Sequence, residues 1–582
     1  MRAKVLQQNR AYKKDISRRI TIVVLFFYAA LLVLGIRVFT LQIMDHHTYV
    51  ALAARQHRTI QSYAPERGSI FAKDKEGGLL GLGLNQIFYR VAVSPRDIRE
   101  QERVVSLLTE TLSMRSEFVE KKIKKTDDPY EIIARHISDE QRKKILNEKM
   151  AGVLIEEEKG RAYPHETLAS HILGFVRKED TKEEGQYGLE RFYDAYLSGK
   201  NTLFGDSAQS GILPFLAALS GRVVRPPERG ADLILTIDYH VQRRSEEILK
   251  NIQEKWNAES GLVLVLEPNT GKIKALASSP TFDPNAFGKE KDFSIFLNPA
   301  TEATYELGSV LKPVTMAAGL EQRIITPETT YTDTGEVRIG NHVIHNFDEQ
   351  AHGIQTMTQV LEKSLNTGVV YVMRLVGQEK QYDFFKRFGL GERTGVDLPG
   401  EVSGSLVNLE HGQEVDAASA SFGQGIAVTP LELASAIAVF ANEGKLMKPY
   451  VVERIVDDAG NEIVHNPEFV RQVVSPETAR AITQMLVSAV RSGFENKARV
   501  KGYFVAGKTG TAQIPRRDGK GYSDEVTHSF VGYAPAFNPR FLVFFQLNKP
   551  KGNRFAANTL TPAFRDLAEY ILNYYEVPPD ER

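Results

Sequence analysis

The sequence predicts an α+β protein carried on a single N-terminal membrane helix. Residues 20–36 carry no charge and follow a basic segment, which is typical of a membrane anchor. In the C-terminal half, segments typical of strands lie at both ends and helical segments lie between them. This order predicts helices packed on an antiparallel sheet. At 582 residues, the chain is long enough for two or three domains.

Composition excludes several functional classes. Lysine plus arginine (73) equals aspartate plus glutamate (73), so no overall charge favours a nucleic-acid partner. Cysteine is absent, which excludes disulfides, thiolate catalysis and cysteine-ligated metals. The 13 histidines include no H-E-x-x-H motif. We therefore expect neither a bound metal nor another cofactor.

The N-terminus predicts where the protein lies. Residues 1–19 contain seven basic side chains and a single acidic one, Asp15, which gives a net charge of +6. Apolar residues then continue to Met44, and about 20 such residues suffice to cross a membrane. Because basic flanks stay in the cytoplasm, we expect a cytoplasmic tail, a cell-membrane anchor over 20–44 and an extracytoplasmic remainder. A signal peptide cleaved near residues 51–53 is the alternative, but the apolar segment is longer than such peptides use.

Residues 45–230 are predicted to form a mixed α/β region. A Gly77-Gly78 break separates extended segments near its start. Residues 98–150 are rich in charge and helical in pattern, and residues 185–200 predict another helix. A Pro-Pro break then precedes a β-like segment, which places the domain boundary near residue 230.

Residues 231–582 are predicted to supply the antiparallel sheet. Two apolar segments flank an Asn-Thr-Gly turn over 261–278, which predicts a hairpin. Three strands and a terminal helix are predicted near the C-terminus, over residues 503–514, 527–537, 540–549 and 562–575.

The stretch "GYFVAGKTGTA" at 502–512 matches the phosphate-binding loop G-x-x-x-x-G-K-[ST] of nucleotide hydrolases. Such a loop needs its Lys-Thr pair to open a helix, whose N–H groups meet the phosphates. Here Gly510 and Pro515 follow instead, and the residues before Gly507 are strand-like. The sequence therefore argues against an ATPase.

Three short motifs occur in order along the chain. They are Ser-x-x-Lys at 309–312, Ser-x-Asn at 364–366 and Lys-Thr-Gly at 508–510. This set is the signature of penicillin-binding proteins and class A β-lactamases. At average composition, Ser-x-x-Lys is expected about twice by chance and Lys-Thr-Gly only about 0.1–0.2 times, so the ordered set is specific.

The first motif predicts an activated nucleophile. Pro313 lacks an N–H group and belongs in the first turn of a helix, so the helix is predicted to begin at about Ser309. Ser309 and Lys312 then share one helix face, where a neutral lysine amine can take the proton of the serine hydroxyl. Burial and the nearby charge of Lys508 are expected to lower the pKa of Lys312.

The other two motifs predict substrate-binding groups. Ser364 is expected to relay a proton to the leaving amine, and Asn366 to hold the substrate backbone from a turn. On the predicted strand, Lys508 faces the site and offers a positive charge to a carboxylate. Thr509 is expected to point away, and Thr511 to return to the site.

Two further groups complete the predicted acyl-transfer site. Gly510 is expected to leave room for substrate to add along the strand edge. The backbone N–H groups of Ser309 and Thr511 are predicted to stabilise the oxyanion of the reaction.

Over essentially its whole length, the chain resembles class B penicillin-binding proteins, which are monofunctional peptidoglycan D,D-transpeptidases. The likeness extends beyond the three motifs to "RGSI", "YGLE", "LTID", "SFGQG" and "SFVGYAP", at residues 67–70, 187–190, 235–238, 421–425 and 529–535. The resemblance implies an elongated pedestal over 45–230, for dimerisation or partner binding, and a β-lactamase-like transpeptidase domain over 231–582. It also implies that D-Ala-D-Ala stem peptides acylate Ser309, that an amine of a neighbouring stem then attacks the ester, and that β-lactams trap this serine.

The resemblance implies partners as well. Because no glycosyltransferase domain is expected before the pedestal, glycan polymerisation would fall to a membrane glycosyltransferase of the shape, elongation, division and sporulation (SEDS) family. Chain length and the short segment after "GKTGTAQ" favour the septal branch, with other division proteins as partners. Two departures from the family pattern are "FAKDKEGG" at 71–78, in place of the usual turn, and Leu307, where proline is usual.

Two alternatives remain open from the sequence. In the first, the chain is a binding subunit whose pedestal activates the glycosyltransferase. In the second, it is a β-lactam sensor or a β-lactamase on the same fold. The roughly 185 residues between anchor and catalytic domain fit the second poorly, and no glutamate stands out as a deacylating base.

Overall fold

The computed structural model describes residues 2–44, 65–125, 128, 130–179, 182–200, 228–493, 497–516 and 521–581. The chain divides into two compact units: the larger comprises residues 66–200 and 228–582, and the smaller contains the N-terminal helix. The alternative cleavage site at 51–53 lies outside the described residues.

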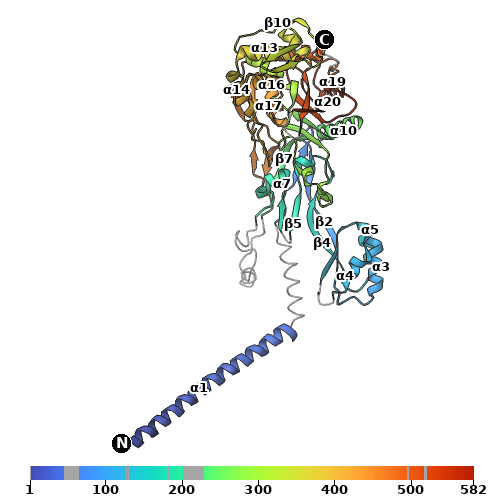
Figure 1. Ribbon diagram of the computed structural model, residues 1–582. Coiled ribbons are helices and arrows are strands. Elements are labelled where there is room, and N and C mark those ends of the chain that lie inside the picture. The colour runs from blue at the N-terminus through green and yellow to red at the C-terminus, as the bar shows by residue number, and fades with distance from the viewer. Residues whose placement is uncertain are drawn as a thin grey trace. The chain divides into compact units, whose positions relative to one another are not determined.

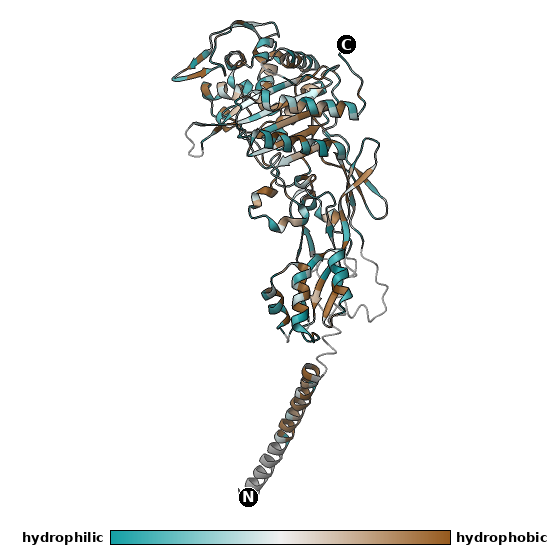
Figure 2. Cartoon of the chain, turned by 90° about the vertical axis from the view of Figure 1, so that its right-hand side faces the viewer, coloured by the Kyte–Doolittle hydropathy of each residue, from teal (hydrophilic) through white to brown (hydrophobic). Residues whose placement is uncertain are grey.

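The N-terminal helix, α1 (Arg2–Phe39), is continued by a π-helical turn, η1 (Thr40–Met44). Its 21 residues Arg19–Phe39 are long and apolar enough to cross a membrane. The large apolar side chains of this segment, such as Phe26 and Leu31, are exposed. Figure 2 shows this part of α1 in the colour of hydrophobic residues. Exposed apolar surface of this extent is costly in water and favourable in lipid. The helix therefore fits a single-pass membrane anchor.

The first part of the larger unit, residues 66–200, combines strands with short helices. The long strand β2 pairs with three others and forms the centre of this part. The elements are β1 (Ile70–Lys73), β2 (Leu79–Val93), α3 (Gln101–Leu112), α4 (Ser116–Ile123), β3 (Glu131–Ile137), α5 (Asp139–Asn147), β4 (Val153–Ala162), α6 (Ser170–Leu173), β5 (Val176–Glu179), β6 (Lys182–Gly185), α7 (Gly188–Phe192) and α8 (Asp194–Leu197).

One segment in this part is a strand where the sequence predicts helix. Residues 98–150 are helical in pattern, yet β3 pairs antiparallel with β2. Glu131 and Ile133 are buried and Ile132 between them is less so, which is the alternation of a strand. Ile133 and Ile137 pack in a separate aliphatic core with residues of α3, α4 and α5. Burial of alternate residues therefore outweighs the helical pattern here.

The second part of the larger unit, residues 228–582, contains most of the helices. Its elements are β7 (Asp232–Asp238), α10 (Tyr239–Trp256), β8 (Ser260–Leu266), β9 (Ile273–Ser279), the 3₁₀ turns η2 (Pro284–Lys289), η3 (Phe293–Phe296) and η4 (Gly308–Leu311), α11 (Lys312–Glu321), β10 (Thr330–Asp333), β11 (Glu336–Ile339), β12 (His342–His345), β13 (Gly353–Thr356), α12 (Met357–Glu362), α13 (Asn366–Val376), α14 (Gln378–Arg387), α15 (Val407–Glu410), α16 (Glu414–Ser421), α17 (Pro430–Ala438), the 3₁₀ turn η5 (Phe440–Asn442), β14 (Lys445–Met447), β15 (Val452–Val456), β16 (Glu462–Val464), β17 (Phe469–Gln472), α18 (Pro476–Ser492), β18 (Ala506–Pro515), β19 (Tyr522–Ala534), β20 (Phe541–Asn548), α19 (Ala556–Thr559) and α20 (Thr561–Tyr574).

A five-stranded antiparallel sheet, in the order β18-β19-β20-β8-β9, forms the centre of this part. Figure 1 shows α17 on one side of this part and α10 and α20 on the other. Helices cover both of its faces. On one face, Val263 and Phe545 pack with residues of α10 and α20. On the other, Leu264 and Phe544 belong to a larger core that includes residues of α11, α17 and α18. The predicted hairpin, the three C-terminal strands, the terminal helix and the α+β class are thus confirmed, and β18 lies at a sheet edge.

A second sheet joins the two parts of the larger unit. Its order is β16-β15-β7-β1-β2-β3, with β4 also paired to β2. Strand β7 runs parallel to β1, with Leu233 opposite Ile70, and antiparallel to β15. Strands from residues 66–200 and 228–582 therefore share backbone hydrogen bonds and buried apolar side chains.

Candidate active site

The three sequence motifs meet at one cleft of about 1080 Å³. The cleft lies where the edge strand β18 faces η4 and the turn between α12 and α13. The predicted residues that line it are Ser309, Ser364, Asn366, Lys508, Thr509 and Thr511. Residues separated by up to 202 positions in the sequence are thus brought to one surface.

Ser309 lies in the 3₁₀ turn η4, and Pro313 lies in the first turn of α11. The α-helix therefore begins at Lys312, three residues later than predicted. The prediction that Ser309 and Lys312 share a face is compatible with this geometry, since residues i and i+3 eclipse in a 3₁₀ turn. Ser309 is half-buried, and among the described residues its hydroxyl has no hydrogen-bond partner. The hydroxyl is thus available to react.

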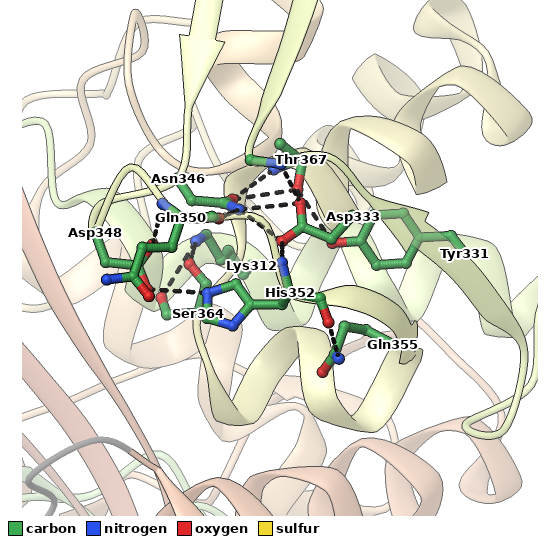
Figure 3. Close-up of polar contacts among 11 residues, drawn as sticks. Lys312, Tyr331, Asp333, Asn346, Asp348, Gln350, His352, Gln355, Ser364 and Thr367 are labelled. Carbon is green, nitrogen blue, oxygen red and sulfur yellow. Dashed lines mark hydrogen bonds and ion pairs between the residues drawn. The ribbon is translucent and has the colours of Figure 1, made fainter.

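Two buried lysines converge on Ser364 (Figure 3 shows Lys312). Lys312 Nζ donates to the Ser364 carbonyl and lies 3.2 Å from its Oγ, and Lys508 Nζ lies 3.0 Å from the same Oγ. The side chains of Lys312 and Lys508 are 0% and 3% exposed. Within the described chain, neither ammonium group pairs with a carboxylate.

Burial without a counterion disfavours the charged form of an amine. Burial and the positive charge of Lys508 lower the pKa of Lys312 well below its ordinary value. Burial lowers the pKa of Lys508 to about 7. The Lys312 amine in its neutral form, in contact with Ser364, can accept a proton.

Ser364 ends the turn after α12, and α13 begins two residues later at Asn366. Its backbone is left-handed, with φ +56°, which is uncommon for a residue other than glycine. The amide of Asn366 donates to the His345 carbonyl at 2.8 Å. The predicted turn is present, and its Asn366 side chain is held by the last residue of β12.

One role predicted on β18, that of Gly510, is wrong. Thr509 and Thr511 line the cleft together with Gly507 and Lys508, because β18 is the edge strand beside it. Residues two apart share a strand face, so Lys508 shares its face with Gly510, and its long side chain still reaches the cleft from there. A β-carbon on Gly510 would collide with the Leu307 carbonyl oxygen and the Ser529 hydroxyl. The glycine therefore makes room for the nucleophile turn, where the prediction reserved that room for substrate.

Sequence patterns did not indicate a further link between the nucleophile segment and the β-hairpin. The Tyr522 hydroxyl donates to Glu306 at 2.9 Å, three residues before Ser309. Burial raises the pKa of Glu306. No motif marks a contact between residues 216 positions apart, so only the paired strands β18 and β19 disclose it. The phosphate-loop interpretation fails for a related reason, since its Lys-Thr pair lies inside β18.

In the residues that the structure describes, no group of three or more His, Asp or Glu side chains could hold a metal ion. The site as described consists of hydroxyl, amine, amide and backbone groups. These are the groups that acyl transfer through a covalent intermediate uses.

Comparisons with known proteins identify the family. Residues 261–569 match the family model of the penicillin binding protein transpeptidase domain, and residues 62–207 match that of the penicillin-binding protein dimerisation domain. Stage V sporulation protein D of Bacillus subtilis is 32% identical, over 98% of this chain and 88% of its own length. The peptidoglycan D,D-transpeptidase FtsI of Buchnera aphidicola is 30% identical, over 77% of this chain and 76% of its own.

Solved structures agree. A crystal structure of penicillin binding protein 3 from Mycobacterium tuberculosis, complexed with aztreonam, has a TM-score of 0.68 at 26% identity. The match covers 89% of this chain and 97% of that one. The transpeptidase model spans more than half of the chain, and the sporulation relative matches nearly all of it. The chain belongs to the family of penicillin-binding protein transpeptidases.

Proposed function

We propose that this chain is a membrane-anchored peptidoglycan D,D-transpeptidase that works through an acyl-enzyme at Ser309. The observation that supports the proposal is that Ser309 and Ser364 line one cleft, and that Ser364 contacts two buried lysines for which the described residues supply no counterion. The names of its relatives, which include peptidoglycan D,D-transpeptidases, support the same activity. Residues of all three motifs line one cleft, which argues against a purely regulatory role.

Acylation would begin with neutral Lys312 taking the proton of the Ser309 hydroxyl. The serine oxygen forms a bond to the carbonyl carbon of the penultimate D-alanine, and backbone N–H groups of Ser309 and Thr511 bind the oxyanion. The peptide C–N bond breaks, and the terminal D-alanine leaves with a proton relayed by Ser364. Lys508 and Asn366 hold the substrate carboxylate and backbone during these steps.

Transfer would reverse the proton movements. An amine of a neighbouring stem peptide attacks the ester carbonyl and loses a proton to the lysine–serine pair. The C–O bond to Ser309 breaks, the serine regains its proton, and the new amide bond is the cross-link. A β-lactam undergoes only the acylation steps. Its ring C–N bond breaks, but the amine remains part of the acyl group, so no amine leaves the site and the opened ring stays attached to Ser309.

We propose further that the basic N-terminal tail is cytoplasmic and that residues 231–582 act outside the membrane. Residues 45–230 form the pedestal, which together with the anchor contacts a SEDS-family glycosyltransferase and other division proteins. The family resemblance supports these partners, and the matched dimerisation domain supports a binding role for the pedestal. Among wall-synthesis processes, we favour septal division. Affinity capture of the full chain from membranes tests this choice, because the partners recovered should be division proteins.

Labelling with penicillin tests the catalytic proposal. Full-length protein is incubated with a labelled penicillin, and the adduct is located by intact mass and peptide mapping. We expect one adduct on Ser309, none in Ser309→Ala, and retained labelling in Ser419→Ala, a control serine that lines the same cleft. An adduct on another residue, or none in the wild type, contradicts the proposal. Rapid release of the adduct would indicate a β-lactamase, and partner activation retained by Ser309→Ala would add a regulatory role.

A further inference from the structure

Helix α13, which follows Ser364 directly, begins without a capping side chain of its own. Leu365 occupies its N-cap position and makes no side-chain cap hydrogen bond. The first backbone N–H groups of a helix need acceptors, and these are usually supplied by a local Ser, Thr, Asp or Asn. Here the N–H of Thr367 donates to Asn346 Oδ1 at 3.3 Å, from a residue 21 positions earlier. The cap comes from a separate segment.

Asp333 holds the capping asparagine in place (Figure 3). The amide of Asn346 donates to both oxygens of Asp333, at 3.0 Å each. The same carboxylate accepts the Thr367 hydroxyl at 2.7 Å and the backbone N–H groups of Gly335 and His352 at 3.1 and 2.9 Å. Asp333 and Asn346 are each 2% exposed. A buried carboxylate with this many donors is rigid, because every lost bond leaves a buried charge less well solvated.

His345, the residue before the capping asparagine, holds the side-chain amide of Asn366, which is predicted to bind the substrate. Asn366 donates to the His345 carbonyl, so His345 and Asn346 hold the successive residues Asn366 and Thr367. His345 and Asn346 also line the cleft, together with their neighbours. The segment is therefore both a wall of the cleft and a clamp on the start of α13.

We propose that Asp333 and Asn346 are positioning residues that hold the Ser364–Asn366 turn in its reactive geometry. The inference rests on the proposed function of that turn. The Oγ of Ser364 lies 3.2 and 3.0 Å from the nitrogens of Lys312 and Lys508. A shift of about 1 Å at the start of α13 would break these contacts, and misplacement of that size can slow a reaction by about a hundredfold.

Substitutions on the clamp test the proposal in the full-length chain. Asn346→Ala removes the cap and two donors to Asp333. Thr367→Val removes only the hydroxyl from the cluster, and Thr367→Ser keeps it, which makes the two a matched pair. Asp397→Asn is the control, because Asp397 also accepts two backbone N–H groups and a tyrosine hydroxyl but does not line the cleft.

Each variant is assayed for its thermal midpoint and for its rate of acylation at saturating labelled penicillin, well below that midpoint. We expect Asn346→Ala to lose at least about tenfold in this rate and Thr367→Val a smaller factor. Thr367→Ser should recover the rate lost in Thr367→Val. Asp397→Asn should lower the midpoint without changing the rate, as a merely structural role would.

A rate within about twofold of wild type for Asn346→Ala would overturn the positioning role. If Asn346→Ala does not fold, Thr367→Val and Thr367→Ser provide the test. Equal acylation rates for these two variants would overturn the positioning role. Wild-type labelling at Ser309 is measured in the same series. The absence of this labelling would contradict the proposed function. Equal labelling rates for wild type and Asn346→Ala would contradict only the positioning role of Asp333 and Asn346.

Discussion

Two buried charged clusters in the larger unit are built in opposite ways. In the arginine cluster, opposite charges lie in contact. In the lysine cluster, two amines contact the same serine hydroxyl, and no carboxylate of the described residues pairs with them. The arginine cluster consists of Arg67, Arg161 and Glu190, and the lysine cluster of Lys312, Lys508 and Ser364.

The arginine cluster keeps its ions charged. Glu190 is 0% exposed, and its oxygens lie 2.7 Å from Arg67 Nε and 2.6 Å from Arg161 Nε. Burial acts to raise the pKa of Glu190, but the two arginine charges outweigh it and lower the pKa. Residues far apart in the sequence, in "RGSI", β4 and "YGLE", are thereby tied together. We infer that this cluster contributes to structure.

The lysine cluster makes the opposite use of burial. With no carboxylate beside them among the described residues, Lys312 and Lys508 both have lowered pKa values. An amine that gives up its proton near neutral pH can serve as a base. The comparison teaches that pairing, more than burial itself, separates a structural buried charge from a reactive one.

Removing the amine of Lys312 should have the largest effect. Lys312→Met keeps an apolar chain of similar length, so we expect acylation of Ser309 to fall by about 10²–10⁴-fold. The thermal midpoint should stay the same or rise, because an unpaired buried amine is removed. Stopped-flow labelling and thermal unfolding measure the two quantities. Acylation at the wild-type rate would show that another group is the base.

Breaking the arginine cluster should give the reverse pattern. Glu190→Gln leaves the buried Arg161 without a counterion and Arg67 with Asp194 alone, at 2.8 Å. Removing one partner of a buried ion pair typically costs about 3–5 kcal/mol of stability. Acylation per folded molecule should be unchanged, since none of these residues lines the cleft. Urea unfolding and active-site titration test this. A large loss of acylation with stability intact would mean that the two clusters are not separate in function.

The pH dependence of stability sharpens the comparison. The folded protein releases the Lys508 proton at about pH 7, whereas an unfolded lysine keeps it to about pH 10.4. Between these values the unfolded state binds more protons, so this group makes stability rise with pH, by at most about 1.4 kcal/mol per unit. Below about pH 7 the burial penalty is fully present. Lys508→Met should flatten the slope in denaturant titrations, and an unchanged slope would argue against a lowered pKa.

The smallest expected effect concerns a hydroxyl at the arginine cluster. Tyr163 donates to Glu190 at 3.2 Å and is buried. Tyr163→Phe removes this bond but leaves both ion pairs, so we expect a loss of about 0.5–1.5 kcal/mol. Urea unfolding of Tyr163→Phe and of Glu190→Gln, measured side by side, compares the two losses of stability. A loss as large as that of Glu190→Gln would show that the hydroxyl, and not charge pairing, stabilises the cluster.

Local pattern predicted much of this molecule. The hairpin at 261–278, the C-terminal strands and the anchor follow from apolar periodicity, which acts over short distances along the chain. The three motifs predicted Ser309, the two lysines and the Ser364 turn as site residues by residue type and order. The parallel pairing of β1 with β7 has no local signature, because it joins residues more than 160 positions apart.

The errors have specific physical causes. β3 carries a helical charge pattern, but alternate burial against β2 decides its conformation. Gly510 accommodates η4 instead of substrate, because its side of β18 packs against Leu307 and Ser529. The cap on α13 comes from Asn346, and no rule of spacing links residues 346 and 367.

The most direct test of the central claim is the protonation state of Lys312. The lysine side chains of the folded protein are labelled with ¹³C beside the amine and titrated by NMR, with Lys312→Met to assign the signal. A Lys312 resonance that is already that of the neutral amine near neutral pH is the result we predict. A resonance that stays that of the ammonium ion up to about pH 10.4, the ordinary lysine value, would contradict a lysine base for Ser309.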